Sequence, residues 1–436
     1  MDDVDPVTAH AWAALGGPSD PTVEYAGAGD VLPARLPVRE MARATVGVCA
    51  LAAAELAATR NGVPASPVRV EEAAVATAFT SERHLRIDGR AGTGFAPLSG
   101  FWRTADGWVR THANYPHHRA RLLDALGVAD RTSLERELAG RRALDVQETV
   151  YAAGGLAVAV ATEPDPTRRP LVETRATEAG KRVLPPASRP ADGVRVLDLT
   201  RVIAGPVATR TLAFLGADVL RVDSPHLPED PDIHADTGPG KRSTLLDLAA
   251  RHDRRTFDDL LDRADVVVTG YRPGALDRHG LAPEALHARR PDLVVAQLSA
   301  WGDRDGWAGR RGFDSLVQAA TGIAAVEGED GVPGVLPAQA LDHGTGYLLA
   351  AAVLRALAEP GGRHVALSLT GTASWLLYDV EPAPAAGDYD PEPWLVETPS
   401  PFGTLRHARP PFGEGTWDRP PTPWGADEPR WQDARR

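Results

Sequence analysis

The feature that most constrains the fold is a regular alternation of short apolar runs and helical runs that begins at Val194. The runs VRVLDLT, ADVLRVD, DVVVTGY and LVVAQLSA are rich in Val and Leu, which is typical of strands buried on both faces. Helical patterns such as VATRTLAFLG, FDDLLDRA and APEALHARR separate them. Because strands that alternate with helices form parallel sheets, the sequence predicts an α/β fold with a doubly wound, Rossmann-like parallel sheet over 194–300.

Ligands of such a sheet bind beyond the carboxyl ends of its strands, where three loops stand out. The loops are TRVIAGP (200–206), which precedes a helix expected from about Val207, VDSPHLPED (222–230), and TGYRPGALDR (269–278). Arg201, Arg272 and Arg278 lie in two of them, and Arg forms charge-assisted bonds with phosphate. The first loop does not read GxGxxG, so an NAD-type site has little support.

Composition narrows the class of protein. Asp and Glu (59) outnumber Lys and Arg (47), and the resulting formal charge of -12 disfavours nucleic acid or an anionic membrane as a partner. The single cysteine, Cys49, excludes an intrachain disulfide and a Cys-based metal site. The N-terminus lacks the pattern of a signal peptide, and the apolar stretch 46–58 contains Glu55 and is shorter than the ~20 residues of a membrane span. We therefore expect a cytoplasmic protein without membrane or metal.

Two segments far apart in the chain resemble each other. Residues 31–62 align with residues 335–362, both start with VLPA, and both continue into an Ala-rich helix and a β-like run. In this register Glu40 is opposite Asp342. Chance similarity of Ala-rich helices is the alternative, but the shared VLPA and the strand that follows favour an internal duplication.

Asp342 stands at the start of the second of these helices. Asp is common at that place as an N-cap, which accepts hydrogen bonds from the free N–H groups of the first turn. A carboxylate in a closed pocket can also act as a nucleophile. The residues alone leave both roles open.

Four motifs then follow in order: GVRVLDLTRVIAGPVATRTLAFLGADVLRVDSP, GKRSTLLDL, ADVVVTGYRPGALDRHGL and GFDSLVQAATG. Together they strongly resemble the family III CoA-transferases (CaiB/BaiF type), the group related to formyl-CoA transferase and carnitine-CoA transferase. The resemblance extends from Val194 to about Leu377. The segment ADGWV and the helix after it are similar to the start of the family's smaller domain, and SPFGTLRHARPPFGEG is similar to its closing segment, so the halves are rearranged.

The resemblance implies a set of site residues. The family's nucleophile is an Asp in a context similar to ALDHGTG, which gives Asp342, and Gly344 and Gly346 would supply backbone N–H groups to the tetrahedral intermediates. The residues that would contact CoA, either in these motifs or beside the GFD motif that ends in Asp314, are Arg201, Val202, Ile203, Ala204, Leu246, Tyr271, Ala275, Arg278 and Arg311.

The implied function is transfer of CoA between an acyl-CoA thioester and a carboxylic acid through an aspartyl intermediate. It requires acyl-CoA as a substrate and no permanently bound cofactor, and family members form homodimers. One alternative is an acyl-CoA racemase of the same fold, which uses a His where this chain has Phe313, and Phe cannot transfer a proton. The other is a CoA-binding protein without catalysis.

The expected organisation has five parts. We expect a degenerate copy of the catalytic-helix region, a small α/β domain, a Pro- and charge-rich linker, the CoA-binding domain with the catalytic helix, and a tail whose Trp residues indicate that it packs on the core. Their bounds are 1–96, 97–163, 164–193, 194–380 and 381–436.

Overall fold

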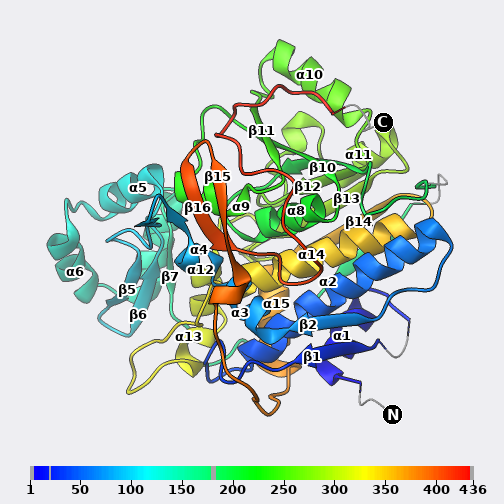
Figure 1. Cartoon of the computed structure of the whole chain (residues 1–436). Helices are drawn as coiled ribbons and strands as arrows, with labels where there is room; N and C mark the ends of the chain where they lie inside the picture. The colour runs from blue at the N-terminus through cyan, green and yellow to red at the C-terminus, as the bar shows by residue number, and fades with distance from the viewer. Residues whose placement is uncertain (1–3, 19–20, 178–182, 433–436) are drawn as a thin grey trace.

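The computed structural model describes residues 4–18, 21–177 and 183–432. Its centre is a seven-stranded sheet in the order β11-β10-β9-β12-β13-β14-β8, in which only β8 is antiparallel to its neighbour (Figure 1). The strands are β9 (Arg195–Leu199), β10 (Asp218–Asp223), β11 (Arg242–Leu245), β12 (Val266–Thr269), β13 (Val294–Ser299), β14 (Arg363–Ser368) and β8 (Glu173–Ala176).

The strand order confirms the expected doubly wound fold. The chain builds the sheet outward from β9 in one direction and then from β12 in the other, so the order reverses between these two strands. Their Val and Leu side chains point alternately to the two faces, and Val196, Leu197 and Val267 are fully buried. Loops that follow the central strands therefore meet at a topological switch point, where such sheets bind ligands.

Helices cover both faces of the sheet (Figure 1). On one face, α8 (Ala204–Phe214) and α14 (Ala340–Ala358) share an apolar core with Val196, Val219 and Val266. On the other, α10 (Arg251–Leu261) and α11 (Pro283–Arg289) pack on Leu197 and Val267. Helix α8 begins at Ala204, three residues before the start expected near Val207, so the loop after β9 is shorter than expected.

The two similar segments fold alike and lie against each other. Helix α2 (Val38–Asn61) packs along α14, and each is followed by a strand and a helix: β2 (Val68–Glu71) and α3 (Glu72–Phe79) after α2, β14 and α15 (Leu369–Tyr378) after α14. The residues before the two helices have nearly equal angles, φ -76° and ψ 61° at Pro37 and φ -74° and ψ 63° at Gln339. The aligned Glu40 and Asp342 are each the third residue of their helix.

Helix α2 is longer than the apolar stretch 46–58 suggested. Among the described residues it alone is long and apolar enough to cross a membrane, and 67% of that apolar window is buried inside the structure. The burial follows from its position between α14 and the helix α1 (Pro6–Ala14).

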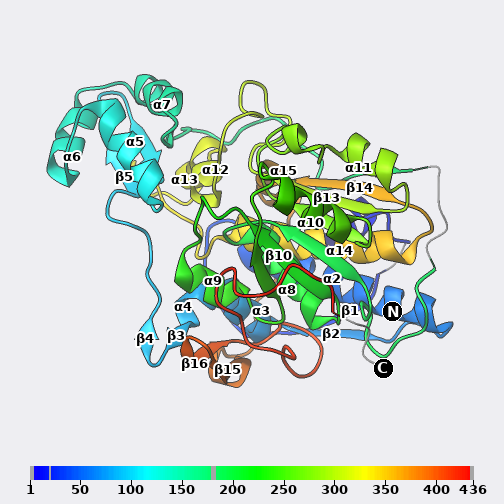
Figure 2. The ribbon, with the colours of Figure 1, turned by 90° about the horizontal axis from the view of Figure 1, so that it is seen from above.

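A second, smaller α/β unit lies to one side of the large sheet (Figure 2). It has its own core around Trp102, Val109, Leu122 and Leu134. Its elements are the antiparallel strands β5 (Gly100–Arg103), β6 (Trp108–Thr111) and β7 (Ala157–Ala159), and the helices α5 (Pro116–Leu126), α6 (Arg131–Ala139) and α7 (Ala143–Ala152).

The C-terminal stretch lies over the rest of the chain. Its hairpin, β15 (Leu395–Ser400) and β16 (Gly403–Ala408), joins β3 (Arg86–Ile87) and β4 (Arg90–Ala91) of the N-terminal part in one sheet (Figure 2). Beyond it, three indole N–H groups donate to the large domain: Trp417 to Arg210 O at 2.8 Å, Trp424 to Asp223 Oδ2 at 3.0 Å and Trp431 to Leu260 O at 3.0 Å. Both ends of the chain thus enclose the central domain.

Candidate functional site

A cavity of about 670 Å³ opens at the switch point, beside Leu199 at the end of β9 and Gly270 after β12. Of the ten residues assigned from the sequence, only Ile203 does not line it, because its side chain packs on the apolar core before α8. The nine that line the cavity are Asp342, Arg201, Val202, Ala204, Leu246, Tyr271, Ala275, Arg278 and Arg311.

Asp342 is nearly buried, with 7% of its surface exposed, and it lines the cavity from the first turn of α14. The helix begins at Ala340, and the N-cap is Gln339, so Asp342 is not the N-cap that the sequence left as an alternative. A different carboxylate binds this helix end. The N–H of Asp342 donates to Asp314 Oδ2 at 2.9 Å, and Asp314 is the first residue of α12 (Asp314–Ala320).

The two carboxyl groups affect each other's ionisation. Burial raises the pKa of Asp342 well above its ordinary value, and the charges of Asp314 and Glu82 raise it further. Burial also raises the pKa of Asp314, against the hydrogen bonds that it accepts. Neighbouring carboxyl groups of this kind titrate as a pair, and the pair retains a proton to higher pH than a free carboxyl would. Once ionised, Asp342 is a poorly solvated carboxylate of the kind that acts as a nucleophile.

The same cavity contains arginines that lack a carboxylate partner. Arg272, Arg278 and Arg311 line it, and none of them forms an ion pair within the part of the chain that the structure describes. Burial lowers the pKa of Arg311, and the positive charges of Arg272 and Arg121 lower it further. Arginines whose charges are not neutralised by a carboxylate are suited to bind the phosphates of a nucleotide.

Arg201 differs from this group. The sequence suggested a free guanidinium for phosphate, but its Nη2 lies 3.3 Å from Glu229 Oε1 and donates to Pro228 O at 2.7 Å. The next residue, Val202, has a left-handed backbone with φ 70°. For a β-branched residue this conformation costs about 1–3 kcal/mol, and it persists only where the surroundings impose it.

The expected oxyanion role of two glycines is wrong. Gly344 and Gly346 lie inside α14, where backbone N–H groups are used by the helix itself. At Gly346 the lack of a side chain serves packing instead. A Cβ at Gly346 would lie 2.6 Å from Ala204 O, so this glycine lets α8 approach α14.

The smaller unit also contributes to the cavity, which the sequence did not predict. Tyr115, His117 and His118 line it from the start of α5. His118 is only 4% exposed, and neither ring nitrogen has a hydrogen-bond partner within the described residues. The signal in the sequence was two adjacent histidines after Tyr-Pro at a helix start. A helix start is a common place for polar residues, so the signal was weak.

Phe313 belongs to a group of stacked rings between the two units. His112 stacks on it with ring centroids 3.8 Å apart and an interplanar angle of 6°. His118 meets its ring edge-on, with centroids 6.0 Å apart. Two imidazoles of the smaller unit thus lie beside Phe313.

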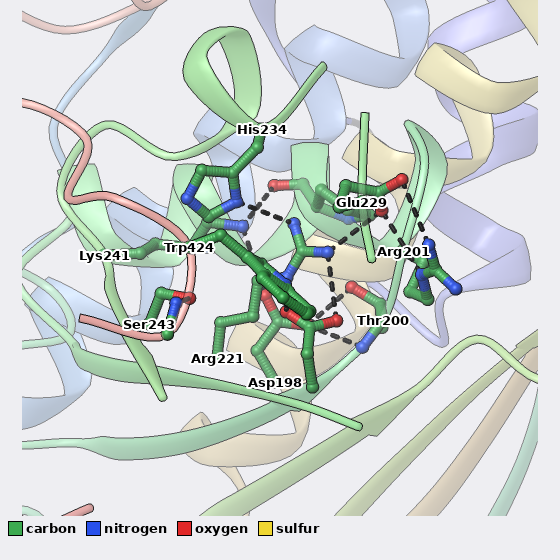
Figure 3. A network of polar contacts seen from close by, with 12 residues as sticks. Asp198, Thr200, Arg201, Arg221, Glu229, His234, Lys241, Ser243 and Trp424 are labelled. Carbon is green, nitrogen blue, oxygen red and sulfur yellow. Dashed lines mark hydrogen bonds and ion pairs between the residues drawn. The ribbon is translucent and has the colours of Figure 1, made fainter. Parts of the chain in front are cut away.

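Buried ion pairs fix the strands beneath the cavity (Figure 3). Lys241 Nζ lies 3.1 Å from Asp198 Oδ2, and Arg221 binds Asp223 through two bonds of 2.7 and 3.1 Å. All four side chains are at most 2% exposed. The Lys241–Asp198 pair links β9 to the start of β11, whereas the Arg221–Asp223 pair lies within β10. Breaking either pair would leave an uncompensated buried charge.

Glu40, the counterpart of Asp342, lies outside the cavity. Its Oε1 accepts from Ala383 N at 2.9 Å and from Arg39 Nη2 at 2.6 Å. The same position of the repeat therefore anchors the C-terminal stretch in one copy and carries the cavity carboxylate in the other.

Comparisons with known proteins give matches in the region that contains the central sheet. The family model CoA-transferase family III matches residues 191–394. The chain is 36% identical to the probable fatty acyl-CoA transferase Rv3272 of Mycobacterium tuberculosis over 184 residues, 39% of this chain and 47% of that protein. It is 37% identical to the succinyl-CoA:mesaconate CoA-transferase of Haloarcula hispanica, over 38% of this chain and 47% of that protein.

Two further matches cover similar shares of this chain. The formyl-CoA:oxalate CoA-transferase of Streptomyces coelicolor is 34% identical over 38% of this chain and 43% of that protein. The crystal structure of Rv3272 is 34% identical, covers 43% of this chain and 56% of that chain, and has a TM-score of 0.41. The chain thus spans about half the length of the curated relatives it matches. Residues 191–394, just under half of this chain, are thus similar to CoA-transferase family III.

Proposed function

We propose that this protein is a CoA-transferase that moves CoA between an acyl-CoA thioester and a carboxylic acid, with Asp342 as the covalent carrier. The observation that carries the proposal is a buried carboxylate in the same cavity as three arginines without carboxylate partners. The arginines would bind the phosphates of CoA, and the loops after β9 and β12 would contact the rest of the CoA moiety.

The chemistry needs only a positioned carboxylate. An oxygen of ionised Asp342 attacks the thioester carbon, the C–S bond breaks, and a mixed anhydride and CoA thiolate result. The thiolate attacks the aspartyl carbonyl of the anhydride, which releases the donor acid and leaves an aspartyl-CoA thioester. An acceptor carboxylate attacks this thioester and expels the thiolate. The thiolate then attacks the acceptor's acyl carbon, so that a new acyl-CoA forms and Asp342 is regenerated as a carboxylate.

Two lines support the proposal. The relatives that match residues in the family region are named as CoA-transferases with different acids, among them oxalate and mesaconate. The raised pKa of Asp342 also fits a group that reacts in a closed pocket.

The test is label exchange. The protein is incubated with short-chain, dicarboxylic and long-chain acyl-CoA in turn, each with a ¹⁴C-labelled carboxylic acid, and the thioester fraction is counted. We expect label in the thioester with at least one pair, and its loss in Asp342→Asn, which keeps the shape of the side chain. If the wild type binds CoA by calorimetry but transfers no label with any pair, a CoA-binding role replaces the proposal.

A second candidate function is proton exchange at the α-carbon of an acyl-CoA. It is favoured by one observation: the buried imidazole of His118 lines the same cavity, although Phe313 occupies the family position of the racemase His. The test is incubation of a chiral 2-methylacyl-CoA in deuterated water. Deuterium at the α-carbon that disappears in His118→Leu would establish this function, and an unlabelled product would exclude it.

A further inference from the structure

The strongest unexplained feature of the site is a fully buried carboxylate behind its CoA loop. Glu229 lies in the loop between β10 and α9 (Pro231–Thr237), and its side chain is 0% exposed. Its two oxygens accept hydrogen bonds from five residues, which lie before α5, after β9, in β10 and directly after Glu229 itself. The donors are Tyr115 Oη at 2.6 Å, Arg221 Nη2 at 2.9 Å, Val202 N and Asp230 N at 3.1 Å, and Arg201 Nη2 at 3.3 Å. Figure 3 shows Glu229 with Arg201 and Arg221.

Two of these bonds reach the loop that lines the cavity. The bond from Val202 N holds the left-handed backbone at that residue, and the bond from Arg201 fixes its guanidinium. A β-branched residue leaves this conformation when the contact that imposes it is removed. Glu229 therefore sets the shape of the loop after β9, a role that no motif in the sequence indicated.

A third bond reaches the smaller unit. Tyr115 precedes α5, lies outside the family region 191–394, and lines the cavity itself. The guanidinium carbon of Arg201 is 5.3 Å from the centre of the Tyr115 ring, so Tyr115 covers one side of Arg201 while its hydroxyl donates to Glu229. The segment before residue 191 thus contacts the same two side chains that shape the CoA loop.

Glu229 remains charged in this enclosed position. Burial alone would raise its pKa, but the charges of Arg221 and Arg201 and the hydrogen bond from Tyr115 hold the pKa at about 2. A carboxylate that accepts several bonds and faces two cations is held in one orientation, and it keeps its donors in place in turn.

We propose that Glu229 is the positioning residue of the CoA site, and that Tyr115 extends its action to the smaller unit, so that this unit must dock for CoA to bind tightly. The inference rests on the proposed function, because the loop matters only if CoA occupies the cavity. Neither residue touches the reacting atoms in this account. Their loss affects binding of the CoA part and leaves the chemical step of the bound complex nearly unchanged.

The test uses Tyr115→Phe in the full-length protein, with Tyr378→Phe as a matched control. Tyr378 also donates its hydroxyl to a partner in the fold, Asp165 O at 2.8 Å, but does not line the cavity. CoA affinity is measured by calorimetry, KM and kcat with the acyl-CoA substrate, and Tm by thermal unfolding. We expect Tyr115→Phe to raise Kd and KM about tenfold, the loss expected for one bond to a charged group, with kcat within about twofold.

Tyr378→Phe, the control, should have the same Kd and KM as the wild type, while its Tm falls as much as that of Tyr115→Phe. Glu229→Gln should weaken CoA binding further, because it removes the negative charge that faces both Arg201 and Arg221. If this variant does not fold, Tyr115→Phe remains decisive. A Kd of Tyr115→Phe equal to that of the wild type overturns the inference and leaves the proposed function standing. A wild type that binds no CoA overturns both.

Discussion

The approach of α8 to α14 can be tested with two glycines of one helix. In Gly346→Ala, the new Cβ would lie 2.6 Å from Ala204 O and 3.0 Å from Val207 Cβ. The first neighbour is a backbone oxygen, so one of the two helices has to shift. In Gly344→Ala, the nearest atom would be Met41 Cε at 3.5 Å, an ordinary contact.

Apart from this contact, the two substitutions should change the free energy of unfolding in the same way. Each substitution should raise the free energy of unfolding by about 1 kcal/mol, because alanine is favoured over glycine inside a helix. The difference between them is therefore the cost of overpacking alone, about 1–3 kcal/mol. We expect Gly344→Ala to be as stable as the wild type or more stable, and Gly346→Ala to be less stable than Gly344→Ala by that amount.

The assay is urea unfolding followed by tryptophan fluorescence, with the free energy of unfolding extrapolated to water. Label exchange in the same samples reports whether the shift of α14 also displaces Asp342, and Gly346→Ala should lose activity while Gly344→Ala keeps it. Equal unfolding free energies for the two variants would refute the packing argument. A loss of activity in Gly344→Ala alone would instead restore a direct role for that glycine.

Three further predictions concern charge and the C-terminal stretch. Asp314→Asn removes a negative charge that raises the pKa of Asp342, so the acid limb of the kcat/KM against pH profile should move to lower pH, and an unmoved limb would contradict the coupling. Arg311→Ala should raise the Kd for CoA at least about tenfold and weaken its salt dependence, whereas equal affinity at low and high salt in both proteins would count against a phosphate contact. Trp431→Ala removes a 95% buried indole and should cost about 3–5 kcal/mol in urea unfolding, whereas a cost below about 1 kcal/mol would show that the stretch is not part of the fold.

The parts of the fold that the sequence predicted are those with strong local patterns. Strands β9, β10, β12 and β13 are runs of Val and Leu because both faces of the sheet are covered, and their bounds differ from expectation by one or two residues. Strand β8, inside the segment 164–193 interpreted as a linker, had no such pattern. Its residues are exposed, and it joins the sheet through backbone bonds to β14, which leave no trace in the side chains.

The site, too, contains residues that the sequence indicated and residues that it did not. Residues of the loops after β9 and β12 were predicted because they follow strands in short motifs, and Asp342 because its context resembles a family motif. Tyr115 and Glu229 were missed because their roles depend on how distant segments dock. The glycines of α14 were misinterpreted, since a glycine beside a nucleophile indicates an N–H donor and a packing contact equally well in a sequence.

Covalent attachment to Asp342 during transfer can be tested by trapping. The protein is mixed with acyl-CoA and then treated with hydroxylamine or, separately, borohydride, and peptides are analysed by mass spectrometry. We expect a hydroxamate or a reduced side chain at Asp342 that forms only with acyl-CoA, and no modification of Asp314, which faces the backbone of α14. An unmodified Asp342 in a sample that transfers label between acids would contradict this expectation.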